Sequence, residues 1–93
     1  MKNLKNKQHL ISYIYGIMCV MNRQKKTVIT EVILMLFNVD AARNWDLDRL
    51  FWFIGDMMTL LEEEKYHTEY WKLLAFVHSH IATYKDEIKD TQE

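Results

Sequence analysis

The chain of 93 residues has no proline and only two glycines, Gly16 and Gly55. Tight hairpin turns and left-handed corners depend on these residue types, and an all-β domain of this length would need several of them. The sequence therefore predicts an all-α fold. Because a domain of this size buries only about 60% of the surface that its unfolded chain exposes, we expect residues 1–93 to form one domain around one core.

Cysteine is almost absent as well. The single Cys19 excludes an internal disulfide, and its apolar neighbours predict that it packs as a small buried side chain. A nucleophilic cysteine would need exposure and a nearby histidine, and the local sequence indicates neither. A chain without disulfides suits a reducing compartment, so we expect a cytoplasmic protein.

No hydrophobic run is long enough to cross a bilayer. The apolar stretch 10–21 follows three lysines and so resembles a signal peptide, but no small-residue cleavage site comes after it. Its length is well short of the roughly 20 apolar residues that a spanning helix needs. We expect a core helix here and no membrane partner.

Acidic residues are missing from the first third of the chain. Residues 1–30 hold six Lys or Arg and no Asp or Glu, whereas residues 31–93 hold six basic residues and all thirteen acidic ones. The two parts therefore carry formal charges of +6 and −7. Such segregation favours attraction between copies of the chain or toward a charged partner, although it is also what the solvated faces of helices produce.

Apolar residues with helical spacing predict the first two helices. The positions Leu10, Ile11, Ile14, Ile17, Met18 and Met21 share one face of a helix over about 8–22. The segment 28–38 has polar residues only at Thr30 and Glu31 before its end, so as a helix it should lie at the centre of the bundle. Its β-branched start also suits a strand, but no second strand is available to pair with it.

Two further helices follow, over about 46–64 and 68–90. Asp46 is the expected N-cap of the first, and its apolar stripe includes Leu50, Ile54 and Leu61. The stripe of the second falls on nearly the opposite side of a continuous helix axis. A break near 65–68 would let both stripes face one core, which predicts a compact bundle of three or four helices with a long C-terminal helix.

The stripe of the last helix repeats as a heptad pattern. It consists of Tyr70, Leu74, Val77, Ile81, Tyr84 and Ile88. A helix over 30 Å long with such a stripe would extend beyond its neighbours and favours self-association as a homodimer. The alternative is that the helix packs only within its own bundle.

Tryptophan marks a second candidate surface. Trp45 and Trp52 are seven residues apart and, in a helix, share the side opposite the core stripe with Asp48, Asp56 and Glu63. Large aromatic rings surrounded by charge are typical of the centres of protein interfaces. The alternative is a second buried face.

The sequence predicts no catalytic centre, no metal site and no cofactor. Glu64 and His67 have the spacing of a di-iron ligand pair, but such a site needs a second copy of the motif. His78 and His80 point in nearly opposite directions on a helix, which suits structural or pH-sensitive roles rather than shared metal binding. No glycine-rich phosphate loop is present.

These observations favour a non-enzymatic protein-protein interaction module, a small regulator or inhibitor that binds a larger protein partner, itself, or both. The alternative is a nucleic-acid-binding regulator in which 28–64 forms a helix-turn-helix and Arg23, Lys25 and Lys26 contact phosphates. That interpretation is weakened by the acids and tryptophan on the expected recognition helix, where Arg, Lys, Asn or Gln would read bases.

Overall fold

The computed structural model describes residues 5–25, 28–63 and 69–88. These residues form five α-helices and no β-strand, which confirms the predicted all-α class. The helices are α1 (Lys7–Lys25), α2 (Val28–Leu36), α3 (Val39–Ala42), α4 (Leu47–Glu63) and α5 (Glu69–Tyr84). The expected break near 65–68 lies outside the described residues, but α4 and α5 on either side of it are separate helices.

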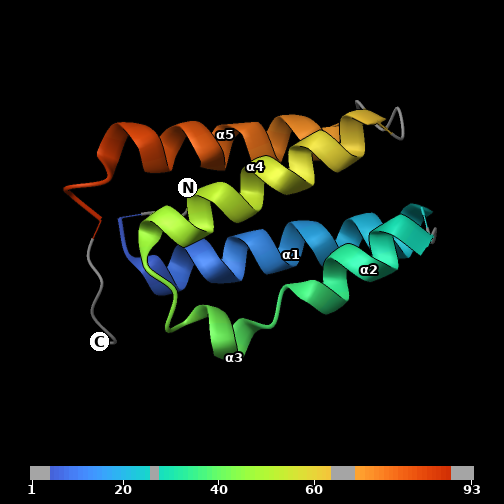
Figure 1. The fold of residues 1–93 in the computed structure, drawn as a ribbon, viewed down its shortest axis with the longest axis horizontal. Helices are drawn as coiled ribbons and strands as arrows, with labels where there is room; N and C mark the ends of the chain where they lie inside the picture. Colours follow the sequence, from blue (N-terminus) through green and yellow to red (C-terminus); the bar gives the residue numbers. More distant parts are fainter. Residues whose placement is uncertain (1–4, 26–27, 64–68, 89–93) are drawn as a thin grey trace.

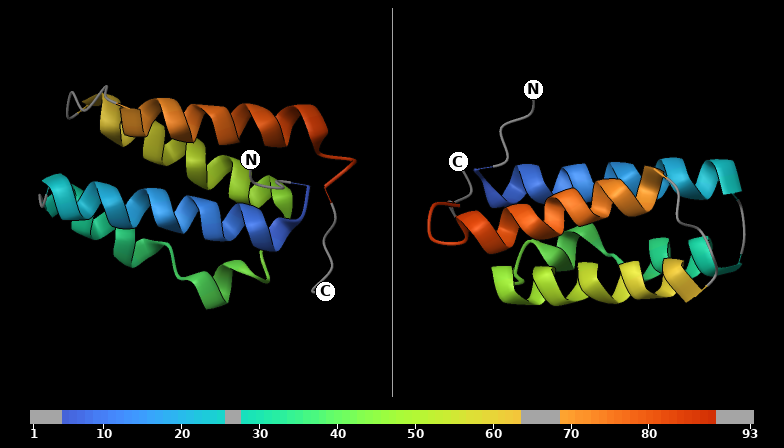
Figure 2. Two further views of the ribbon diagram at one scale, coloured as in Figure 1. Left: turned by 180° about the vertical axis from the view of Figure 1, so that it is seen from behind. Right: turned by 90° about the horizontal axis from the view of Figure 1, so that it is seen from above.

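The helices lie in two layers (Figure 1). One layer holds α1 and α5, and the other holds α2, α3 and α4, as the view from above in Figure 2 shows. The closest packing joins α4 to α5 and α1 to α2, with α1 also lying against α5 and α3. The result is a compact body of 35 × 24 × 24 Å.

Short polar side chains begin α3 and α4. Asn38 Oδ1 accepts a hydrogen bond from the Ala41 amide at 3.1 Å, and Asp46 Oδ1 accepts one from the Arg49 amide at 2.8 Å. Each bond satisfies a backbone donor that the first turn of a helix leaves without a partner. The predicted N-cap at Asp46 is therefore confirmed, whereas α3 was not predicted.

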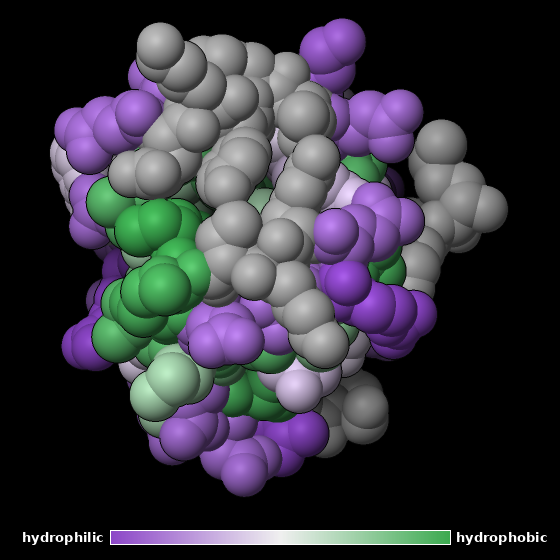
Figure 3. Space-filling model, turned by 90° about the vertical axis from the view of Figure 1, so that its right-hand side faces the viewer, coloured by the Kyte–Doolittle hydropathy of each residue, from purple (hydrophilic) through white to green (hydrophobic). Residues whose placement is uncertain are grey.

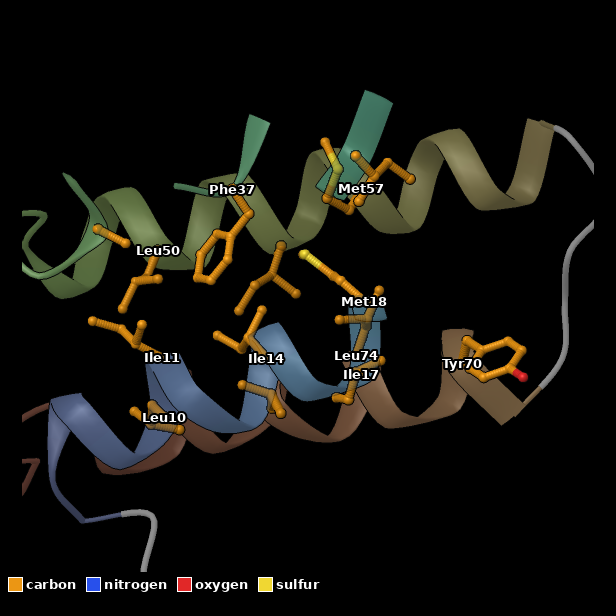
Figure 4. Close-up of a cluster of buried hydrophobic side chains, with 14 of the residues drawn as sticks. Leu10, Ile11, Ile14, Ile17, Met18, Phe37, Leu50, Met57, Tyr70 and Leu74 are labelled. Carbon is orange, nitrogen blue, oxygen red and sulfur yellow. The ribbon is translucent and has the colours of Figure 1, made fainter. Parts of the chain in front are cut away.

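The helical stripes read from the sequence converge on one core. All six predicted positions of α1 are buried, and so are Leu50, Ile54, Met57 and Leu61 of α4. Figure 4 shows side chains of α1 pointing toward Phe37 and toward Leu50 and Met57 of α4, with Leu74 of α5 beside Ile17. The phase argument for two helices facing one core is thus confirmed.

The structure corrects two expectations. α5 ends at Tyr84 rather than near residue 90, so it does not extend beyond the bundle. A turn follows, in which the Ile88 amide donates to the Tyr84 carbonyl, and Ile88 folds back into the core. Also, α2 lies at the edge of the bundle rather than at its centre, since only one of its faces is buried.

Candidate interaction surface

Trp45 lies before α4 and packs inward. Its ring contacts Phe37 edge-on at a centroid distance of 5.9 Å and Phe53 at 5.3 Å. The Arg49 guanidinium covers the ring at 4.6 Å. Aromatic pairs of this geometry stabilise a fold by more than their buried area alone. Trp45 is therefore a packing residue at the start of α4, half-buried against the core.

Lys7 ties the start of α1 to this tryptophan. It is only 3% exposed, and its Nζ donates a hydrogen bond of 2.8 Å to the Trp45 carbonyl. The bond satisfies a backbone acceptor that the turn before α4 leaves open. A buried lysine in this place was not predicted, because the sequence around it is the basic N-terminal region and carries no signal of burial.

The outer face of α4 carries the other predicted contact residues. Asp48, Trp52, Asp56 and Glu63 are all exposed, and they fall within about 80° of one another on the helix. We call these four residues the α4 ridge. Trp52 is 68% exposed, and only its edge-on contact with Phe51 supports it. The structure thus separates the two tryptophans that the sequence placed together.

One end of the ridge is joined to the C-terminal turn. Lys85 Nζ lies 2.5 Å from Asp48 Oδ1, and this carboxylate raises the pKa of Lys85 above its ordinary value. Both groups are exposed, so solvent screens the ion pair. Its structural effect is to hold residue 85 beside the first turn of α4.

His78 fills the seam between α5 and α4. Its ring stacks on Phe51 at a centroid distance of 3.8 Å, and a Cβ placed on Gly55 would lie 3.4 Å from its Nε2. Burial lowers the pKa of His78 below its ordinary value. His80, on another side of α5, lies beside Phe76 and Tyr84 as the spacing predicted.

The heptad stripe of α5 lies within the chain's own core. Five of its six members are buried, namely Tyr70, Leu74, Val77, Ile81 and Ile88, and only Tyr84 is substantially exposed. The Tyr70 hydroxyl also donates to the side chain of Gln24 on α1. The packing of this stripe matches the alternative in which the helix packs within its own bundle.

An apolar surface that sequence reasoning missed lies on α2. Val28, Val32, Met35 and Leu36 project from one side of the helix and are all exposed, Val28 by 76% and Met35 by 79%. We call these four residues the α2 stripe. Figure 3 shows apolar surface gathered on the left, where α2 and the neighbouring α4 lie. One signal for it was present in the sequence, since Glu31 marks the solvent side of this helix.

A shallow groove lies between α1 and α5. It has a volume of about 320 Å³, and Tyr13, Gly16, Val20 and Leu73 are among the side chains that line it. A Cβ on Gly16 would meet no atom within 4 Å, so the groove is open above this glycine. Cys19 is half-buried elsewhere on α1.

The remaining candidates are dispersed or undescribed. Arg23 is exposed near the end of α1, but the side chain of Lys25 and all of Lys26 lie outside the described residues, as do Glu64 and His67. Within the described ranges, no three His, Cys, Asp or Glu side chains gather as a metal site requires. Among the same residues, no helix has the length and apolar character to traverse a bilayer.

Comparisons with known proteins add no family to this description. No family model matches the chain, and neither does any curated protein or solved structure.

Proposed function

We propose that this chain is a non-enzymatic protein-binding module, a small regulator or inhibitor that docks on a larger protein through the α4 ridge. The observation that carries the proposal is the 68% exposure of Trp52 on a regular helix, between Asp48 and Asp56 one turn away on each side. An exposed tryptophan held by a rigid helix offers a large contact area at a small entropic cost.

The charge of the ridge indicates the kind of surface that it fits. Asp48, Asp56 and Glu63 surround the indole, so a complementary partner presents an apolar pocket with a basic rim. Attraction of this kind steers association and weakens as salt increases. The same acids repel phosphates, which argues against α4 as the recognition helix of a nucleic-acid-binding protein.

The test compares two exposed aromatic side chains on different helices. The wild-type chain, Trp52→Ala and Phe76→Ala are immobilised, and proteins captured from a lysate of the source cells are identified, purified and titrated by calorimetry. We expect Trp52→Ala to reduce affinity at least tenfold, the effect of losing one central anchor residue. Phe76 is 54% exposed on α5, and its loss should leave affinity within about twofold.

Salt and nucleic acid supply the second part of the test. Affinity for the partner should fall between low and high salt, because the ridge is acidic. Equal losses in the two alanine variants would contradict the proposal, and so would tight binding of a generic DNA duplex that Trp52→Ala leaves unchanged.

A further inference from the structure

The α2 stripe is not explained by the fold of a single chain. α2 is apolar nearly all round, and a helix of that kind is normally covered on every side. Here Thr30, Ile33 and Phe37 face the core, whereas the α2 stripe on the other side faces solvent. Soluble proteins that expose a contiguous apolar patch commonly use it for binding.

We propose that the α2 stripe is the self-association surface of this protein and that its occupant is the α2 stripe of a second copy, related by a two-fold axis. This surface is separate from the α4 ridge, so the inference goes beyond the proposed binding of a partner. It also places self-association on α2, since the α5 stripe that the sequence indicated is used within the core.

The stripe is self-complementary. Val28, Val32 and Leu36 are spaced by four residues, and Val32 lies at the middle of α2. In an antiparallel pair with its two-fold axis at Val32, Val28 of each copy packs on Leu36 of the other. The long side chain of Met35 fills the space beside the axis, as flexible methionine does at many interfaces.

Charge favours the same arrangement. The last turn of α2 has no basic residue, so the negative end of the helix dipole is uncompensated by its own side chains. The chain segment before α2 is basic and includes Arg23, which is exposed. Antiparallel pairing brings the basic start of each α2 to the end of the other, where cations are favourable.

The polarity of the surface also favours a second copy over an unrelated protein. Glu31 is the one charged residue of α2, and it lies at the rim of the stripe. A surface without polar groups has little means of selecting a distinct partner, whereas an isologous contact needs only its own shape repeated. The stripe covers a few hundred Å² per copy, which is the lower end of specific interfaces and implies a weak dimer.

The first test is sedimentation velocity of the full chain from about 1 to 300 µM, a range around the dissociation constant of roughly 10 µM expected for so small an interface. We expect a reversible monomer–dimer equilibrium. Met35→Lys should weaken it at least tenfold, because the charge would be buried against the second copy. Phe76→Lys adds the same charge on α5 and should leave dimerisation unchanged.

The second test is a cross-link that depends on the position of the axis. In a Cys19→Ser background, Val32→Cys should form a disulfide-linked dimer rapidly on mild oxidation, because equivalent residues at a two-fold axis approach within the range of a disulfide. Phe76→Cys in the same background should not. Circular dichroism spectra that match the wild type confirm that each variant is folded.

Two results would overturn the proposal. One is a chain that stays monomeric over the whole concentration range. The other is a dimer that persists in Met35→Lys while Val32→Cys fails to cross-link, which would place the contact elsewhere. Neither result depends on Trp52, so this inference and the proposed function fail separately.

Discussion

Truncating the two tryptophans near the start of α4 should have opposite consequences for stability. Trp45→Ala removes a half-buried indole together with its contacts to Phe37, Phe53 and Arg49. Buried aromatic residues lose about 3–5 kcal/mol of stability on truncation to alanine, and partial burial places Trp45 near 3 kcal/mol. Trp52→Ala removes a ring that is mostly in solvent, and we expect a change within about 0.5 kcal/mol.

Urea unfolding followed by far-ultraviolet circular dichroism measures both effects. For a domain of this size the slope is about 1 kcal/mol per molar urea, so the midpoint of Trp45→Ala should fall by about 2–3 M. Trp45→Phe is the control, because it retains a ring against Phe37 and Phe53 and should lose less than half as much. A Trp52→Ala midpoint lowered as far as that of Trp45→Ala would refute the reasoning, since both rings would then be structural.

Three further substitutions test other features. Gly16→Ala should raise stability by about 0.5–1 kcal/mol, because its Cβ would meet no atom and alanine is the better helix former, and a fall in the thermal midpoint would contradict this. Lys7→Met should lower stability by about 1–3 kcal/mol in urea unfolding, because it leaves the Trp45 carbonyl without its donor; an unchanged midpoint would contradict the contact. The pKa of His78 is lowered below 6.5 in the folded chain, so the unfolded state binds the proton more tightly and stability should fall as pH drops below about 6.5. This part of the pH dependence of the unfolding free energy should vanish in His78→Gln and persist in His80→Gln, and the reverse pattern would contradict the assignment.

The helices with alternating polar and apolar faces could be predicted from the sequence. In α1 and α4, the spacing of apolar residues distinguishes the core side from the solvent side, and the buried residues follow it. The phase change between the stripes of α4 and α5 indicated two helices although no glycine or proline separates them. Asp46 could be identified as an N-cap because its carboxylate precedes a regular stripe.

The position of Trp45 could not be derived from helical phase. The spacing of seven residues from Trp52 implies a common side only if both residues are helical. Asp46 caps α4, so Trp45 lies before the helix, where the chain turns and directs the ring toward Phe37. The end of α5 was misjudged for a related reason. A spacing of four residues from Tyr84 to Ile88 fits a continuing helix, but it also fits the turn that returns Ile88 to the core.

The placement of α2 shows what a periodicity argument leaves undetermined. When a helix is apolar on two opposite sides, its pattern states that both sides need covering but does not state which chain covers them. The described residues supply cover for one side, through Ile33 and Phe37 against α1 and the rest of the core. The side that carries Met35 therefore requires a surface from outside the chain, and the helix is too short and too uncharged to form a polar interface there. An apolar, self-complementary contact between two copies is the arrangement that removes this surface from water with the residues that the chain already has.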